Sequence, residues 1–227
     1  MRINLALSLA ILLSATSAYA AERSFPVSAF ERIDLEGSAD VDVRTGLAAS
    51  VVASGDEEQL ERLDIRVEDG LLRIGQKRGS WGWDRGRGKV RIAVTTGALS
   101  SATLSGSGNM SVDRLSGAFS ARLSGAGDMA LPKVEASTLA LAISGSGTMK
   151  AAGSCAEATV RVSGSGNIDA AALQCRAIRV AVTGSGNVNA QATGTADLAI
   201  TGSGNIEVAG GARCTTRTTG TGTTRCG

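Results

Sequence analysis

A seven-residue motif recurs six times in this 227-residue chain, and its near-constant spacing restricts the possible folds more than any other feature. Each copy reads hydrophobic, Ser or Thr, Gly, small, Gly, polar, hydrophobic. Successive copies begin 18 to 20 residues apart, and a frayed seventh follows at 219–222. Such a period indicates a repeat architecture. The first glycines of the copies are Gly106, Gly125, Gly145, Gly164, Gly184 and Gly202.

Apolar residues alternate with polar or small residues on both sides of this first glycine. They stand two and four positions before it and four and six positions after it, as Leu123, Ala121, Met129 and Leu131 do around Gly125. A period of two indicates β-strands, and the identical turn in each copy favours coils that stack about 4.8 Å apart. The sequence therefore predicts an all-β fold, a parallel β-helix (solenoid) with coils of about 19 residues.

The predicted domain organisation is a leader at 1–20 followed by one solenoid domain at 21–227. Within that domain we expect an irregular N-terminal coil and β cap at 25–100, regular coils at 101–210 and a C-terminal cap at 211–227. The segment 33–43 matches the repeat template and reads as a degenerate first coil. The rest of the cap predicts strands at 51–53 and 89–94, a capped helical turn at 56–61, and a hairpin that turns at Asp69-Gly70.

Four cysteines test the stacking. Cys155 and Cys175 are 20 residues apart, which is one repeat, so the two should lie on neighbouring coils. A coil height of about 4.8 Å lies within the Cα separation that a disulfide tolerates. We therefore predict a Cys155–Cys175 disulfide, and a second between Cys214 and Cys226 that closes the last coil.

The N-terminal residues predict export. A positive charge at Arg2, an apolar run at 5–13 and the small-residue pattern Ala18-Tyr19-Ala20 are typical of a signal peptide with cleavage before Ala21. No later segment has the length and hydrophobicity of a transmembrane helix. The expected location is periplasmic or extracellular, where disulfides persist.

Composition excludes several kinds of site. The chain has no His, which removes the usual triad base and most zinc motifs. Its formal net charge of +2 predicts no nucleic-acid partner. We expect no cofactor, and the sequence leaves the oligomeric state open.

Three stretches together resemble a known family. They are Phe30-x-x-Ile33 continuing to Val43, Val67-x-Asp69-Gly70-x-Leu72, and the serial Ser/Thr-Gly-Ser-Gly-Asn turns. In these the chain resembles the head GIN domain family of auto-transporter adhesins over about residues 25–210. The resemblance implies a right-handed parallel β-helix in an envelope or secreted protein. It implies no catalytic residues.

A ladder of polar residues follows the second glycine of each motif. Glycine-rich turns of this kind resemble calcium-binding repeats, but calcium needs six to eight oxygen ligands and only one ladder residue is an acid. The interpretation that these side chains satisfy local backbone groups is therefore favoured. The ladder consists of Asn109, Asp128, Thr148, Asn167, Asn187 and Asn205.

A second candidate is the segment 81–89, which contains both tryptophans of the chain. Its aromatic rings and cations could stack on sugars or bind a phosphate, or the segment could be a loop that covers the side of the solenoid. The candidate ligand contacts are Trp81, Trp83, Arg85 and Arg87.

An acid pair for glycan cleavage is the third candidate. Asp169 and Glu207 share one position in the repeat, two coils apart, with Asn189 between them. Two carboxylates about 9.6 Å apart would suit an inverting glycosidase, but no other catalytic group converges on them. The sequence favours a non-catalytic, exported adhesin-like binding or scaffold module whose partner is a cell-envelope glycan or protein. The alternative is a polysaccharide-acting β-helix enzyme, either a lyase or a glycoside hydrolase.

Overall fold

The protein is described by a computed structural model over residues 21–77 and 89–227. The predicted leader at 1–20 lies outside these described residues. So do the candidate ligand contacts Trp81, Trp83, Arg85 and Arg87.

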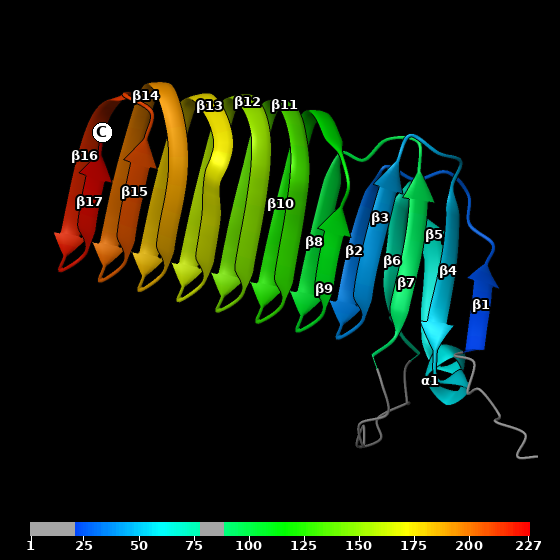
Figure 1. Ribbon diagram of the computed structural model, residues 1–227. Coiled ribbons are helices and arrows are strands. Elements are labelled where there is room, and N and C mark those ends of the chain that lie inside the picture. The colour runs from blue at the N-terminus through cyan, green and yellow to red at the C-terminus, as the bar shows by residue number, and fades with distance from the viewer. Residues whose placement is uncertain (1–20, 78–88) are drawn as a thin grey trace, which may run out of the picture.

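The regular part of the chain forms parallel coils stacked along one axis (Figure 1). Each coil pairs in register with the next, and Gly125 lies opposite Gly145, as the repeat predicts. The β-solenoid is therefore confirmed. Its long strands are β10 (Leu115–Gly125), β11 (Asp128–Gly145), β12 (Thr148–Gly164), β13 (Asn167–Gly184) and β14 (Asn187–Gly202).

Each coil turns sharply at its glycine motif, which we call the corner. We call the strand segments that run up to the first glycine the pre-corner sheet and those that leave the corner the post-corner sheet. β8 (Ser101–Gly106) and the last residues of each long strand belong to the first sheet. β9 (Asn109–Val112) and the opening residues of each long strand belong to the second.

The corners stack because their glycines leave room for the backbone of the coil beneath. Gly145 has a φ of +128°, and a Cβ placed on it would lie 2.3 Å from the carbonyl oxygen of Gly125. That same oxygen accepts hydrogen bonds from the backbone N–H groups of Ser146 (2.9 Å) and Gly147 (3.1 Å). The contact between coils is thus too close for any side chain at this position.

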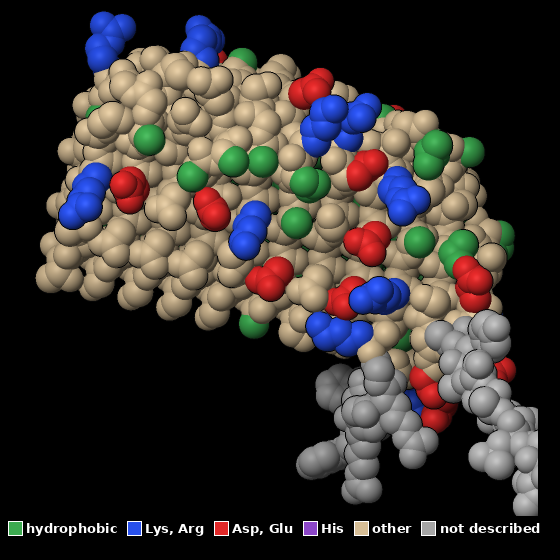
Figure 2. All heavy atoms as spheres, in the orientation of Figure 1, with side chains coloured by type: hydrophobic (Ala, Val, Ile, Leu, Met, Phe, Trp, Pro, Cys, Tyr) green, Lys and Arg blue, Asp and Glu red, His purple; other side chains and the backbone are tan. Residues whose placement is uncertain are grey.

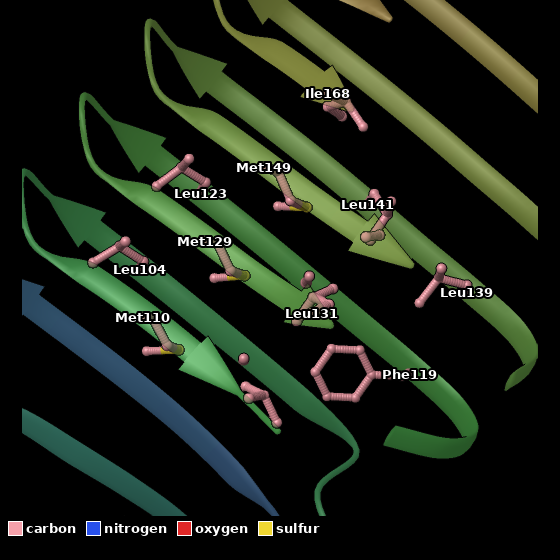
Figure 3. Close-up of a cluster of buried hydrophobic side chains, with 14 of the residues drawn as sticks. Leu104, Met110, Phe119, Leu123, Met129, Leu131, Leu139, Leu141, Met149 and Ile168 are labelled. Atoms are coloured by element: carbon pink, nitrogen blue, oxygen red, sulfur yellow. The ribbon is translucent and has the colours of Figure 1, made fainter. Parts of the chain in front are cut away.

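The core is a thin layer of aliphatic side chains between the two sheets. Met110, Met129 and Met149 follow one another up the post-corner sheet and face Leu104 and Leu123 on the pre-corner sheet (Figure 3). All five are at most 1% exposed. Because coils stack in register, each inward position forms a continuous apolar column, which excludes water along the whole axis.

The N-terminal coil has the predicted register, and strands of the cap cover its outer edge. β2 (Arg32–Gly37) and β3 (Asp40–Thr45) pair in parallel with β8 and β9, and Gly37 lies opposite Gly106. On their other edge they pair in parallel with β6 (Leu71–Gln76) and β7 (Arg91–Thr96). The coil at 33–43 is therefore the second layer, and a segment later in the chain forms the first.

Antiparallel strands and one short helix complete this end (Figure 1). β5 and β6 form the predicted hairpin, in which both Asp69 and Gly70 have positive φ, as a type I′ turn requires. Asp56 caps the helix by accepting a hydrogen bond from the N–H of Glu58. The remaining elements are β1 (Ala21–Phe25), β4 (Ser50–Gly55), α1 (Glu57–Glu61) and β5 (Leu63–Glu68).

The C-terminal residues form a full coil rather than a frayed one. β16 (Arg213–Gly220) pairs with β14, and β17 (Thr223–Cys226) pairs with β15 (Asn205–Ala209), both in parallel. Gly220 lies opposite Gly202. Threonines occupy positions that are apolar in the other coils, so a polar layer covers the end of the core.

Candidate binding surfaces

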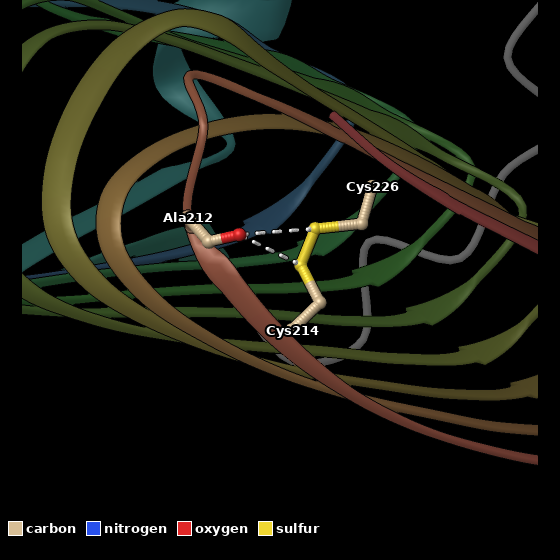
Figure 4. Close-up of a disulfide and its surroundings, with 3 residues drawn as sticks. All are labelled: Ala212, Cys214 and Cys226. Atoms are coloured by element: carbon tan, nitrogen blue, oxygen red, sulfur yellow. Dashed lines mark hydrogen bonds between the residues drawn. A yellow bond between two sulfur atoms is a disulfide. The ribbon is translucent and has the colours of Figure 1, made fainter.

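Both predicted disulfides are present. Cys155 and Cys175 lie opposite each other on β12 and β13, with their Cα atoms 4.5 Å apart. Cys214 and Cys226 join β16 to β17 across the last coil, and the carbonyl oxygen of Ala212 lies against both sulfurs (Figure 4). The cysteines link strands and leave no free thiol among the described residues.

The polar ladder lies on the outside of the post-corner sheet, and several of its members bond to one another. Asn187 donates from Nδ2 to Oδ1 of Asn167 (2.9 Å), and Asn205 donates in the same way to Asn187 (2.9 Å). At the other end Asn109 donates to Asp40 Oδ1 (2.7 Å). These amides therefore link coils through side-chain hydrogen bonds.

Asp128 and Thr148 interrupt the ladder, since neither is joined to it by a side-chain hydrogen bond within the described residues. They line a hollow of about 440 Å³ together with Asp40, Asp42 and Lys150. Nowhere in 21–77 or 89–227 do three or more Asp, Glu, Cys or His side chains come together as metal ligands would. The calcium alternative thus gains no set of ligands from this surface.

The acid pair has the neighbours that its repeat positions predict. Asp169 pairs with Asn189, and Asn189 pairs with Glu207, along the post-corner sheet. Along this sheet Lys150 lies opposite Asp169, and Glu207 lies opposite Arg225. Figure 2 shows one face of the molecule, on which Lys and Arg side chains are interspersed with Asp and Glu. All four paired residues are exposed, and the two acids lie between the two cations along the sheet. Neither acid lines any hollow described here.

A smaller hollow of about 320 Å³ lies near the N-terminal cap. Its apolar lining comes from Leu35, Leu63 and Ile74, and Glu36 and Arg62 contribute charged groups. Residues 77–90 connect β6 to β7. In the neighbouring coil, only Ser38 and Ala39 connect β2 to β3. The strands of this first layer are thus separated by 14 residues in the sequence, against two in the next coil.

One carboxyl group near this end has a perturbed titration. Burial raises the pKa of Asp34 above its ordinary value, and the nearby charge of Glu36 acts in the same direction. The guanidinium of Arg73 opposes both effects. Asp34 Oδ1 is buried and has no hydrogen-bond partner among the described residues.

Sequence reasoning missed one surface. The outer side of the pre-corner sheet contains Arg122 and Arg161, which line a common hollow of about 540 Å³ over β10 to β13. Both stand three residues before a first glycine. The repeat alignment could have revealed them, had outward positions been compared as closely as inward ones.

Comparisons with known proteins agree on one family and one fold. A family model described as "Putative auto-transporter adhesin, head GIN domain" matches residues 29–212. No curated protein matches the chain. No helix within the described ranges is both long enough and apolar enough to cross a bilayer.

Several crystal structures share the fold. A putative adhesin from Bacteroides fragilis has a TM-score of 0.87 at 21% identity, over 92% of this chain and 98% of its own. A putative lipid binding protein from Parabacteroides distasonis has a TM-score of 0.75 at 22% identity, over 92% and 97%. A putative adhesin from Parabacteroides merdae has a TM-score of 0.72 at 19% identity, over the same shares.

Proposed function

Because this chain belongs to the head GIN domain family, whose description is that of an auto-transporter adhesin, we propose that it is an exported, non-catalytic binding module of the cell envelope. The observation that carries the proposal is the register of the coils. Residues one position before each first glycine are Ser or Thr in every coil from Ser105 to Thr219, and they lie side by side.

A rigid surface that repeats one side chain at each coil height suits a ligand that repeats as well. Each contact is weak, but a second contact on the same rigid scaffold is intramolecular, so the contacts reinforce one another. The names of the structural neighbours, adhesin and lipid binding protein, both describe non-covalent binding. For this chain we propose a cell-envelope glycan or protein as the partner.

Export is supported by the two disulfides and by the proposed leader at 1–20. Disulfides are stable in the periplasm or outside the cell and are rare in the reducing cytosol. The mature chain would then begin at Ala21.

The enzyme alternative has less support. The acid pair Asp169 and Glu207 stands on an exposed strand face of mixed charge, with Asn189 between the two carboxylates. General acid catalysis needs one carboxyl group held protonated by its surroundings. An exposed strand face on which each acid lies opposite a cation, Lys150 or Arg225, offers no such environment.

A glycan array incubated with residues 21–227 and combined with an assay for released reducing ends tests the proposal. We expect retention on a subset of glycans with no increase in reducing ends. Heat-unfolded protein is the control for non-specific adhesion. New reducing ends would establish the enzyme alternative. Failure to retain any glycan, together with failure to retain any envelope protein in a pull-down, would leave the proposal without a ligand and refute it.

A further inference from the structure

We propose that the outer surface of the pre-corner sheet binds an anionic polysaccharide, with Arg122 and Arg161 as its principal contacts. This inference rests on the proposed function and specifies the face and the ligand class. The surface consists of the outward residues among the five that precede each first glycine, from β8 to β16.

The register sets the spacing of the cations. Arg122 lies opposite Ala142, which lies opposite Arg161, and Arg161 lies opposite Ala181. Arg122 and Arg161 are thus two coils apart, or about 9.6 Å. Farther along the same line Ala199 separates Ala181 from a third arginine, Arg217.

The alternation of long and small side chains makes a hollow. Arg122 and Arg161 rise beside Ala142, and the three contribute to the same hollow of about 540 Å³. Ser124, Ser144, Ser163 and Thr183 line one side of it. These four residues are exposed, and their hydroxyls make no hydrogen bond within the described part of the chain. Guanidinium groups and free hydroxyls therefore face the same space.

The surface has few acids from β8 to β16, and Asp34 and Glu36 of β2 adjoin its N-terminal edge, opposite Thr103 and Ser105. Between β8 and β16 its single acid is Asp197, which lies 3.5 Å from the guanidinium of Arg179. Arg122, Arg161 and Arg217 form no ion pair with any described residue. The post-corner sheet, in contrast, carries acids beside cations, since Asp169 lies opposite Lys150 and Glu207 lies opposite Arg225. A negatively charged ligand is therefore favoured on the pre-corner face.

The density of charge selects among anionic polymers. DNA carries one charge about every 1.7 Å, far denser than arginines about 9.6 Å apart, and this surface lacks the aromatic rings that stack on bases. A polysaccharide in which charged and neutral sugars alternate has sparser anions. Between those anions it presents hydroxyls, which can both donate to and accept from a Ser/Thr column. Arginine suits the anions because its planar fork binds a carboxylate or phosphate in bidentate geometry.

Binding of residues 21–227 to hyaluronate, in which charged and neutral sugars alternate, tests the inference when it is measured by calorimetry. Arg122→Thr/Arg161→Thr should raise the Kd about tenfold, because each exposed ion pair is worth up to about 1 kcal/mol. Threonine preserves strand propensity, so the fold should survive. The matched control, Arg44→Thr/Arg114→Thr, removes the same charge from two exposed arginines away from this sheet and should leave the Kd unchanged. Arg122→Lys/Arg161→Lys keeps the charge but loses the bidentate geometry, so its Kd should lie between those of the parent and the threonine pair.

Neutral dextran and polyglutamate separate the possible failures. The inference would be refuted if neutral dextran bound as tightly as the anionic polysaccharide, or if the control pair lost as much affinity as Arg122→Thr/Arg161→Thr. Either result would leave the proposed function standing. Tighter binding of polyglutamate than of hyaluronate would assign the face to an acidic protein and refute the ligand class. Absence of any glycan or envelope-protein partner in the earlier experiments would remove both proposals together.

Discussion

At the scale of single residues, the two glycines of each corner are required for different reasons. The first glycine needs a positive φ and also lies against the carbonyl of the coil beneath, as at Gly145. The second needs only space, since a Cβ on Gly147 would lie 2.2 Å from the carbonyl oxygen of Gly127. The coil at Gly37 has Ala39 at its second position. A Cβ on Gly37 would meet no described atom within 4 Å, so no described residue packs on this corner as Gly125 packs on Gly145.

This distinction predicts an order of destabilisation among alanine variants. Gly117→Ala should cost roughly 1–2 kcal/mol, because Gly117 has φ +77° but no described atom lies within 4 Å of its would-be Cβ. Gly147→Ala should cost about 3 kcal/mol or more, since backbone must move. Thermal melting of the purified parent, Gly117→Ala and Gly147→Ala proteins measures the order of their stabilities. A Gly147→Ala protein that melts at or above the Gly117→Ala temperature would contradict the steric argument.

At the scale of elements, the sequence was sufficient for the coils and insufficient for the strand pairing within the N-terminal cap. Inward columns, corners and disulfide pairing follow from local period and could be predicted. That β6 and β7 form a layer beyond β2 and β3 depends on pairing between strands far apart in the chain, which no local pattern encodes. The proximity of Arg122 and Arg161 could have been predicted, because both stand three residues before a first glycine. Outward residues such as these do not determine the fold, so the pattern that predicts the coils does not include them.

The two disulfides should protect different parts of the stack. Each coil contacts mainly its neighbours, so unfolding can remain local. Cys214→Ser/Cys226→Ser should lose hydrogen-exchange protection in β16 and β17 while β11 to β13 stay protected. Cys155→Ala/Cys175→Ala should lower stability by about 3 kcal/mol through the 20-residue loop it opens, and should weaken protection in β12 and β13. Loss of protection along the whole solenoid in the first variant would show a cooperative unit larger than a coil.

At the scale of the whole molecule, the ends of the stack are built differently from its middle. The antiparallel strands β1, β4 and β5 occupy the N-terminal end (Figure 1). At the C-terminal end Thr216, Thr218 and Thr224 stand opposite Leu198, Ile200 and Ile206. A solenoid needs such polar end layers, since an apolar column that simply stopped would be exposed to water and to other chains.

Removal of the last coil should therefore convert the end into an adhesive surface. Deletion of residues 211–227 would uncover Leu198, Ile200, Ile206 and Val208, which are now at most 2% exposed, together with the free strand edges of β14 and β15. We expect the shortened protein to associate more strongly than the parent, end to end, in light scattering after gel filtration at matched concentrations. Restoring a polar end by Ile200→Thr/Ile206→Thr in the shortened chain should reduce that association. If the truncated and full-length proteins form particles with the same number of copies, the threonine coil does not prevent association. The edge of β14 must then be protected by other means.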